Sequence, residues 1–456
     1  MSIPEIAGLR ITNAPELRGH AIRADAKTVE KPAVCSHCGE GPLHRHGASE
    51  KTVADAPLRG WVVEIAIQCQ RYKCQRCGKT TAAPISGVHL NRALTERFFE
   101  ELGEATLRRT FADVASQYHV DESTLGFICR EYAQRLERKV QFDVPEVLGI
   151  SAVTYQNETH ALLVDIGQGA PYDLLESPTP KELEKYLDAM WDPDIDEAIH
   201  TVVIDANDTY RACVEAVLPE SYIVLAPATL RELAYSCAHK VRQEIYRHAT
   251  RTQRTRIAWA DEFLKKPRNM LSVAQKAKHD LLASPAENDQ GLRRITTAYD
   301  KCEDLAEIYE AKNRRLAETK ARQWLHSMPA EIASDFEPLQ ETLRTWWDPI
   351  LDWHIAEITE TELNSLRGLA DGINARGRGY NFEILRAKLL FYPPKRSAQP
   401  PLTQQPSGQP MMGYMTTLQT SVSPVQRPTH RGPRIVDLLE HMDAITGSRV
   451  DEEKIG

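Results

Sequence analysis

Apolar and polar residues alternate along residues 61–71, which read WVVEIAIQCQR. The odd-numbered positions from Val63 to Cys69 are apolar, and this period of two is typical of a half-buried β-strand. We therefore expect a strand over residues 61–71 that leads into the segment CQRCG at residues 74–78.

After residue 94 the apolar spacing becomes helical. Residues 94–107 and 110–118 each place apolar side chains on one face, and a third segment with this spacing begins at Asp121 or Ser123. Thr, Asp and Ser, which stand at the starts of these segments, are residue types that cap helix N-termini. The pattern predicts three consecutive helices.

Short apolar runs typical of strands begin near residue 147. Three runs, one helical segment and two more runs follow one another at residues 148–153, 159–167, 171–177, 180–190, 199–208 and 221–226. The order β-β-β-α-β is that of an RNase H-like domain, a mixed sheet covered by helices. Residues 230–360 are then almost continuously helical, and residues 368–390 read as a Gly- and Arg-rich turn followed by an amphipathic helix.

Four cysteines form two CxxC pairs, Cys35 with Cys38 and Cys74 with Cys77. Two such knuckles hold one tetrahedral Zn²⁺ through four thiolates, so we expect a structural zinc ribbon. The alternative is that these are scattered cytosolic thiols. The further candidate ligands His44, His46 and Cys69 are expected to be loop and strand residues instead.

The helical segments around FADVASQYHVDESTLGFICREY, residues 111–132, fit a helix-turn-helix. Ala115 would be the small residue at the helix crossing, Val120 the buried turn residue, and Leu125 and Ile128 the core anchors of the third helix. The outer side and flanks of this helix would carry Glu122, Thr124, Gly126, Phe127 and Arg130. An ordinary helical hairpin in an all-α core is the alternative.

Charge is distributed unevenly along the chain. The net charge is −8, yet residues 1–140 carry 20 Lys and Arg against 17 Asp and Glu. This asymmetry places a phosphate-facing surface in the N-terminal third. A second basic cluster comprises Arg376, Arg378, Arg386, Lys388, Lys395 and Arg396. The expected DNA contacts are Arg108, Arg109, Glu122, Thr124, Phe127, Arg130, Arg376 and Arg378.

The 456 residues are enough for several domains, and 42% hydrophobic content is that of a globular protein. No run approaches the roughly 18 apolar residues of a membrane span, and the N-terminus lacks a signal-peptide pattern. Nine cysteines, four of them in CxxC pairs, suit a reducing compartment. We expect a cytoplasmic protein.

The C-terminal region differs in composition from the rest. Residues 397–433 are mostly Pro, Gln, Ser and Thr and are expected to be disordered, because they cannot bury enough apolar surface. Residues 435–445 could form three turns of amphipathic helix. This helix would either dock on a protein partner or fold back on the chain.

Together these features predict a multidomain α+β protein. The expected domains are a zinc ribbon at residues 1–88, a helix-turn-helix at 89–142, an RNase H-like domain in two pieces at 143–230 and 363–396, a helical insertion at 231–362, and a disordered tail with a short helix at 397–456.

This combination resembles the ISL-three family of bacterial insertion-sequence transposases over roughly residues 30–392. The most specific stretches are CSHC with YKCQRCG, FADVASQYHVDESTL, VVIDANDTYRACVEAVLP, AYDKCEDLAEIYE, LRTWWDPILDW and GLADGINARGRGYNFEILRAKLL. The resemblance implies a DDE triad, in which two aspartates and a glutamate bind two Mg²⁺ ions for phosphodiester transfer. It also implies double-stranded DNA as partner, a homo-oligomer, and a bacterial cytoplasmic protein associated with the nucleoid when bound to DNA.

The triad carried over from the family is incomplete. Ser151 stands at the first aspartate position, Asp205 matches the second, and Asp371 occupies the glutamate position. The family's Asp-Lys-Phe-His motif appears as residues 226–229, Ala-Pro-Ala-Thr. A serine hydroxyl supplies neither the charge nor the two oxygens that Mg²⁺ prefers, so we expect Mg²⁺ binding to be impaired. Asp165, Asp208 or Glu158 could substitute as the missing ligand.

Three functions follow from these motifs. The leading hypothesis is a transposase-like protein that recognises a specific DNA duplex and whose strand-transfer centre is vestigial. The second is an active transposase with an altered metal site. The third is a protein-interaction scaffold with residual DNA binding.

Overall fold

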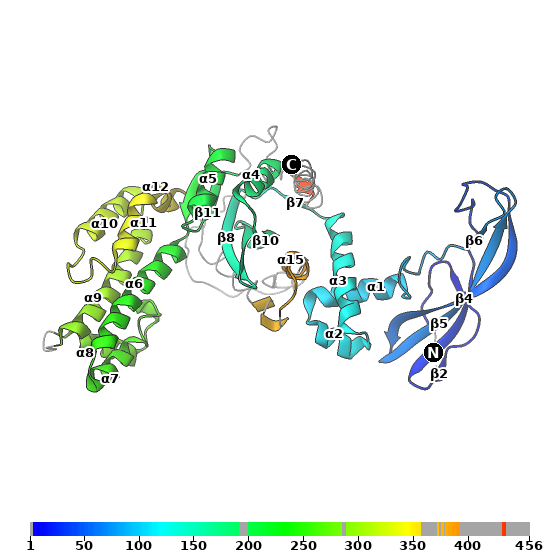
Figure 1. Cartoon of the computed structure of the whole chain (residues 1–456), viewed down its shortest axis with the longest axis horizontal. Coiled ribbons are helices and arrows are strands. Elements are labelled where there is room, and N and C mark those ends of the chain that lie inside the picture. Colours follow the sequence, from blue (N-terminus) through cyan, green and yellow to red (C-terminus); the bar gives the residue numbers. More distant parts are fainter. Residues whose placement is uncertain are drawn as a thin grey trace, which may run out of the picture. The chain divides into compact units, whose positions relative to one another are not determined.

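The computed structural model describes residues 3–190, 199–284, 289–356, 372–373, 375–377, 379–391 and 431–434. Its chain forms two compact units, shown in Figure 1. Unit 1 comprises Met1–Lys139 and Gly372–Leu402, and unit 2 comprises Val140–Asp371 and Thr403–Gly456. Asp371, Arg378 and the expected helix at 435–445 lie outside the described residues.

The N-terminal part of unit 1 is a six-stranded sheet. Its strands are β1 (Leu9–Ile11), β2 (Glu16–Arg18), β3 (Ala21–Thr28), β4 (Leu43–Leu58), β5 (Trp61–Cys74) and β6 (Thr80–Ala82). The long hairpin of β4 and β5 is antiparallel, whereas β3 runs parallel to β5. The expected strand at residues 61–71 is confirmed as part of β5, and the buried Val63, Ile65 and Ile67 form the core of the sheet.

Three helices follow the sheet as the apolar spacing predicted. They are α1 (Glu96–Arg108), α2 (Phe111–Tyr118) and α3 (Glu122–Glu137). The side chains of Thr95, Thr110 and Asp121 each accept a hydrogen bond from a backbone N–H of the first turn, which satisfies a donor that the helix leaves unpaired. Helix α2 ends at His119, whose positive φ of 56° turns the chain toward α3.

A buried carboxylate joins the sheet to α1. Asp55 on β4 is 2% exposed, and its Oδ1 accepts hydrogen bonds from Thr95 Oγ1 at 2.6 Å and from Arg97 Nε at 2.8 Å. Arg97 also pairs with the second oxygen of Asp55. The sheet is thereby connected to the first turn of α1 by charged hydrogen bonds as well as by the chain.

Helix α15 (Phe382–Phe391) packs against α1 and α3. The sequence analysis predicted a helix in this region and grouped residues 363–396 with the RNase H-like domain. By its contacts α15 belongs to unit 1, with the three helices that precede residue 139.

Unit 2 contains a five-stranded sheet in the order β10-β9-β8-β11-β12. The elements are β8 (Val147–Tyr155), β9 (Glu158–Asp165), β10 (Ala170–Leu175), α4 (Pro180–Met190), β11 (Thr201–Ile204), α5 (Asp208–Val217) and β12 (Tyr222–Leu225). Strands β8, β9 and β10 are antiparallel neighbours, while β11 is parallel to both β8 and β12. This is the topology of an RNase H-like sheet, as expected, with α5 as a helix that the sequence analysis did not predict.

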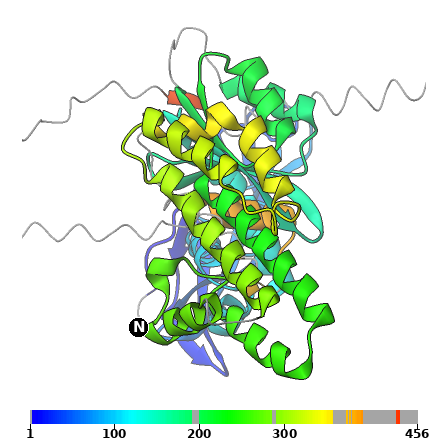
Figure 2. The ribbon, with the colours of Figure 1, turned by 90° about the vertical axis from the view of Figure 1, so that its left-hand side faces the viewer.

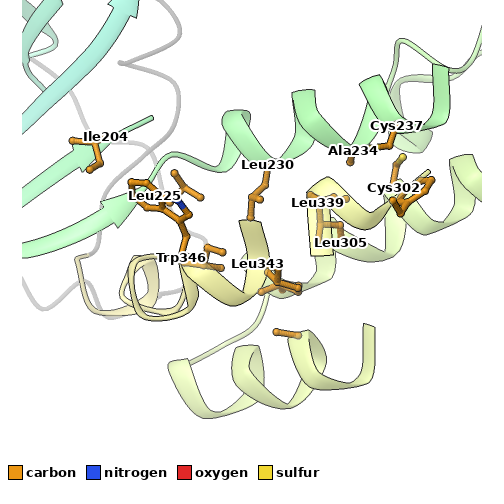
Figure 3. Packing of buried hydrophobic residues seen from close by; sticks show 14 of the residues in the cluster. Ile204, Leu225, Leu230, Ala234, Cys237, Cys302, Leu305, Leu339, Leu343 and Trp346 are labelled. Carbon is orange, nitrogen blue, oxygen red and sulfur yellow. The ribbon is translucent and has the colours of Figure 1, made fainter. Parts of the chain in front are cut away.

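A bundle of helices follows β12. Its members are α6 (Pro227–His248), α7 (Arg251–Ala260), η1 (Arg268–Met270), α8 (Val273–Ala283), α9 (Gln290–Tyr309), α10 (Arg314–His326), α11 (Glu337–Thr345), α12 (Trp347–Leu351) and α13 (Trp353–Ala356). Figure 2 shows the long helices lying alongside one another. Buried residues of the sheet and of the helices form one core. Leu225, Leu230 and Trp346 belong to this core and are shown in Figure 3.

A small two-stranded sheet completes unit 2. Strand β13 (Arg431–Arg434) pairs with β7 (Gln141–Asp143). Residues 431–433 fall in the segment expected to be disordered; in the structure they belong to this strand, in which Arg431 lies opposite Asp143 and Arg434 opposite Gln141.

Candidate metal centres and nucleic-acid interface

The four CxxC cysteines converge at one point. Their Sγ atoms lie within 4.8 Å of one another, and the Cys35–Cys77 and Cys38–Cys74 sulfurs are each 3.7 Å apart. Zn–S bonds of about 2.3 Å in a tetrahedron require sulfurs that are about 3.8 Å apart. Four thiols at this spacing fit a structural Zn²⁺ with no position left open for a substrate.

The two knuckles have the same backbone turn. Gly39 N–H donates to the carbonyl of Cys35, and Gly78 N–H donates to the carbonyl of Cys74, at 2.9 and 3.0 Å. Both glycines have positive φ, 72° and 69°, which a residue with a Cβ adopts at a cost. This turn lets each loop direct two sulfurs at the same centre.

Backbone N–H groups favour the thiolate form of the inner ligands. The N–H of His37 and the hydroxyl of Thr81 lower the pKa of Cys35 to about 6, and the N–H of Cys77 lowers the pKa of Cys74. Burial and the neighbouring thiols raise the pKa of Cys38 to about 12. A bound divalent cation would offset that cost by compensating the negative charge.

The other candidate ligands lie elsewhere. His44 and His46 are exposed residues of β4, and Cys69 is buried in the apolar core of the sheet. The expectation that they are loop and strand residues is confirmed.

The second candidate centre lies at the C-terminal end of β11, where Asp205 follows Ile204. Ile204 is in register with Ile150 on the parallel strand β8, so Ser151 lies beside Asp205. Ser151 is fully buried, and its hydroxyl donates a hydrogen bond to Asp205 Oδ2 at 3.0 Å. The fold thus brings together the two residues that the resemblance assigned to the first and second triad positions, and the first of them presents a hydroxyl.

Two further donors reach the Asp205 carboxylate. Ala152 N–H donates to Oδ2 at 3.0 Å, and Thr229 Oγ1 donates to Oδ1 at 3.2 Å. Thr229 is the last residue of the segment that departs from the family's Asp-Lys-Phe-His motif. The hydroxyls of Ser151 and Thr229 therefore both donate to Asp205, and neutral hydroxyls do not fit a site for two divalent cations.

Strand register argues against two of the three residues that were expected to be able to replace a carboxylate at position 151 as a metal ligand. Ser151 pairs with Leu162 on β9, whereas Asp165 pairs with Leu148 and Glu158 pairs with Tyr155. At about 3.4 Å per residue, Asp165 is roughly 10 Å from the Ser151 position along the sheet, in the direction opposite to Glu158. The third substitute, Asp208, is exposed at the start of α5.

The third triad position, Asp371, lies outside the described residues. Within the described part of the chain, the cysteine cluster is the only group of three or more His, Cys, Asp or Glu side chains close enough to hold one metal ion.

Helix α3 provides the candidate DNA-reading face. Leu125 and Ile128 are fully buried, as expected of its core anchors, while Phe127 is 54% exposed. The Arg130 guanidinium lies 4.8 Å from the Phe127 ring centroid and pairs with Glu383 on α15 at 3.3 Å.

Two expectations for this motif are wrong. Gly126 is buried because Phe111 and Ile384 lie next to it, so it does not lie on the outer side of α3. Val120 is only half-buried, since the turn is fixed by the backbone of His119 and the cap at Asp121.

Thr124 is engaged at the helix cap. Its hydroxyl donates to Asp121 Oδ2 at 2.7 Å, and the hydroxyls of Ser123 and Thr124 lower the pKa of Asp121. The exposed Glu122 lies beside this cap. Thr124 therefore has a structural role already, which lowers its value as a base-reading residue.

The exposed side of α3 continues beyond the residues that the sequence analysis chose. Ser123, Phe127, Gln134 and Arg138 are exposed at spacings of three or four residues, with Arg130 partly exposed between them. Gln134 and Arg138 were missed, although their helical spacing from Phe127 could have identified them.

The remaining predicted arginines differ in their surroundings. Arg108 forms an exposed ion pair with Glu104, and Arg109 bridges α1 to α2 through Gln117 and the carbonyl of Asp113. Arg376 is exposed, and its Nε donates to the carbonyl of Gly372 at 3.0 Å. Arg109 is thus partly committed to the structure of the helical region.

The expectation that Arg386 and Lys388 face phosphates is wrong, because both are buried on α15. Arg386 pairs with Glu137 at the end of α3. Lys388 Nζ donates to the carbonyls of Thr106 and Arg109 at the C-terminal end of α1. A cation is favourable at this helix end, so these residues attach α15 to the helix-turn-helix.

Comparison with family models identifies both regions. Residues 148–389 match the ISL3 DDE family model, described as transposase. Residues 31–77 match the model described as the zinc-finger of transposase IS204/IS1001/IS1096/IS1165. A comparison with curated proteins found no match. None of the described helices is long and apolar enough to cross a membrane.

Proposed function

Because the chain belongs to the ISL-three (ISL3) family of transposases, we propose that it recognises a specific DNA duplex and that its DDE centre is catalytically silent. The resident structural metal is the zinc of the four cysteines. The proposal therefore concerns two questions beyond family membership, namely which surface reads DNA and whether phosphodiester chemistry survives.

The hydrogen bond from Ser151 to Asp205 is the observation that supports a catalytically silent DDE centre. Mg²⁺ requires oxygen ligands in near-octahedral geometry at about 2.0–2.1 Å, and carboxylates supply both the oxygens and the charge. Ser151 supplies one neutral oxygen, and Asp205 already accepts three hydrogen bonds. A metal ion at Asp205 would have to compete with these donors without a second carboxylate from β8.

Duplex recognition rests on the exposed side of α3. Phe127, Gln134 and Arg138 offer an apolar contact, an amide and a guanidinium, and such groups read base edges and phosphates. We place Arg130 on this surface as well, since its pairing with the exposed Glu383 is weak enough to be exchanged for a phosphate. The other residues expected to contact DNA remain candidates for additional contacts. They are Thr124, Glu122, Arg108, Arg109, Arg376 and Arg378.

The zinc ribbon and the helix-turn-helix would act on DNA together. Asp55 connects the sheet of the ribbon to Thr95 and Arg97 at the start of α1, which supports a fixed orientation of the two. A homo-oligomer and a protein partner bound through residues 435–445 belong to the same proposal, and their support is the sequence pattern and the family.

An active transposase is the second candidate, and one observation favours it. The strand order is intact, and Asp205 lies at the end of β11 beside the first strand, where the catalytic aspartate of an RNase H-like centre belongs. The residue at position 151 decides between the two candidates.

A selection experiment tests the proposal. The full-length zinc-loaded protein is used to select duplexes from a random pool, and the selected duplex is then incubated with protein and Mg²⁺ or Mn²⁺. We expect enrichment of one sequence and no nicking. Failure to enrich any sequence would contradict specific recognition, and metal-dependent nicking would favour the active enzyme.

A further inference from the structure

A strongly basic segment lies in the helical insertion of unit 2. Residues 240–268 carry nine Lys and Arg against three Asp and Glu, although the whole chain has a net charge of −8. A local excess of this size marks a candidate surface for a polyanion.

The basic residues gather where α6 ends and α7 begins. Helix α6 runs from the end of β12 to His248, and α7 starts at Arg251, so only two residues separate the helices. In Figures 1 and 2 this corner lies at the end of the bundle away from the strands of unit 2. Side chains here project from a helical support that the buried core holds in place.

Three arginines at this corner are exposed and carry no ion pair with any described carboxylate. They are Arg247 on the last turn of α6 and Arg251 and Arg254 on the first turns of α7. The nearby acids are occupied, since Glu244 pairs with Arg294 and Asp261 pairs with Arg242. The positive charge of the three arginines is therefore available to a ligand.

An exposed tyrosine orients one of these three arginines. Tyr246 is 40% exposed, and the guanidiniums of Arg254 and Arg242 lie 5.0 and 5.7 Å from its ring centroid. Cation–π contacts reduce the number of directions that an arginine samples. Because guanidiniums occupy the surroundings of the ring, this tyrosine supports phosphate contacts rather than stacking of an unpaired base.

The position of Arg251 at a helix N-terminus has a local cost. The N-terminus of a helix favours acidic residues, yet Arg251 is the first residue of α7 and the first turn of this helix contains no acid. The helix start is secured instead by the capping box of Thr250 and Gln253. Retention of a cation at an unfavourable place is typical of a functional site.

We propose that Arg247, Arg251 and Arg254, oriented in part by Tyr246, form a second DNA-binding surface that contacts the phosphates of duplex DNA outside the segment read by α3. This inference rests on the proposed duplex recognition and adds a contact site within the insertion. Phosphate contacts of this kind would add affinity and salt dependence without sequence preference.

The test is the salt dependence of duplex binding by the full-length protein carrying Arg247→Gln, Arg251→Gln and Arg254→Gln. Each lost phosphate contact lowers the slope of log K against log[salt] by about 0.9, so three contacts give a change of about 2.7. A control variant with Lys185→Gln, Lys312→Gln and Arg315→Gln removes the same charge from other exposed positions of unit 2. A second variant with lysine at the three arginine positions keeps the charge and should keep the slope.

Three results decide the inference. A smaller slope in the glutamine variant, with the slopes of the control and lysine variants unchanged, supports it. If wild type binds duplex and the glutamine variant has the same slope as the control, this inference is wrong while the proposed function stands. If the wild-type protein binds no duplex, the proposed function and this inference both fail. Circular dichroism of each variant establishes that the helices are intact.

Discussion

The hydroxyl of Ser151 donates a hydrogen bond to Oδ2 of Asp205, with 3.0 Å between the two oxygens. Each residue follows directly after the stretch in which the parallel strands β8 and β11 pair, which ends with Ile150 opposite Ile204. Under the proposed function, a hydrogen-bond donor therefore occupies the position at which the family resemblance implies a metal ligand. Thr229 extends the same pattern to the other oxygen of Asp205.

Replacing Ser151 by Ala should destabilise unit 2. The substitution removes one donor to Asp205 at a fully buried position, and lost hydrogen bonds to charged groups typically cost about 1.5–3 kcal/mol. We expect the urea midpoint of the transition assigned to unit 2 to fall. Thr229→Val serves as the comparison and should have a smaller effect, since its hydrogen bond is longer at 3.2 Å. An unchanged midpoint for Ser151→Ala would show that the hydroxyl contributes nothing to the stability of this site.

Replacing Cys35 or Cys74 by Ser should release the zinc and unfold the ribbon. Both cysteines are buried, and the free energy of metal binding in such modules is also free energy of folding. Metal analysis of protein never exposed to chelator should give one Zn per chain for wild type and none for either variant. Cys237→Ala in the core of unit 2 is the control and should keep its zinc. A wild-type protein without stoichiometric zinc would refute the ribbon.

Replacing Lys388 by Met should weaken the attachment of α15 to α1 and change the pH dependence of the stability of unit 1. Burial lowers the pKa of Lys388 from its ordinary value of 10.5 to about 8. The unfolded chain then binds more protons than the folded chain between these values, so the free energy of unfolding of wild type should rise with pH across this interval. The variant should lose this rise. The stability that it loses relative to wild type should be greatest near pH 10, where the neutral lysine still donates to the carbonyls of Thr106 and Arg109 and no buried charge opposes folding.

The same experiment has a clear contrary result. If thermal unfolding of wild type and Lys388→Met responds equally to pH from 7.5 to 10, the lysine is not held in the buried environment of α15. Arg315→Met, at an exposed position of unit 2, controls for loss of one cation.

Replacing Arg130 and Arg138 by Ala should weaken duplex binding. Arg130 is partly exposed on α3 and Arg138 is exposed at its C-cap, and each phosphate contact contributes about 0.9 to the salt slope. A gel-shift titration at two or more salt concentrations measures both affinity and slope. Replacing Thr124 as well should add little affinity change beyond loss of the cap, since its hydroxyl bonds Asp121. Unchanged affinity of the triple variant would mean that another surface reads DNA.

Much of unit 2 could be predicted from the sequence because its strands are short apolar runs that are buried on both faces. The helix at Pro180–Met190 and the positions of β8 to β12 agree with the expected segments. The sheet of unit 1 could not be predicted in the same way. Residues 44–50 of β4 are all exposed, so this half of the strand has no alternation of buried and exposed residues to reveal it, and its pairing with β5 defines it.

The candidate sites likewise include features that the sequence predicts and features that it does not. The cysteine spacing predicted a cluster that the structure confirms, because each knuckle is formed by a local turn. The resemblance placed Ser151 and Asp205 in one triad, but it could not predict that the hydroxyls of Ser151 and Thr229 donate to the Asp205 carboxylate. Ser151 reaches Asp205 through the register of β8 and β11, and Thr229 reaches it from the start of α6. The burial of Lys388 was missed for a related reason. A basic residue late in the chain reads as a surface residue until its contact with α1 is known.

The central claim is that the serine at position 151 silences the strand-transfer centre. The most direct measurement is cleavage of the bound duplex by wild-type protein in the presence of Mg²⁺ or Mn²⁺, followed on denaturing gels beside Asp205→Asn and Ser151→Asp. We predict no nicking or strand transfer by wild type or Asp205→Asn, and at most a trace by Ser151→Asp, because residues 226–229 also depart from the family. Robust metal-dependent cleavage by wild type that is abolished by Asp205→Asn would contradict the account and establish an active transposase with an unusual ligand set.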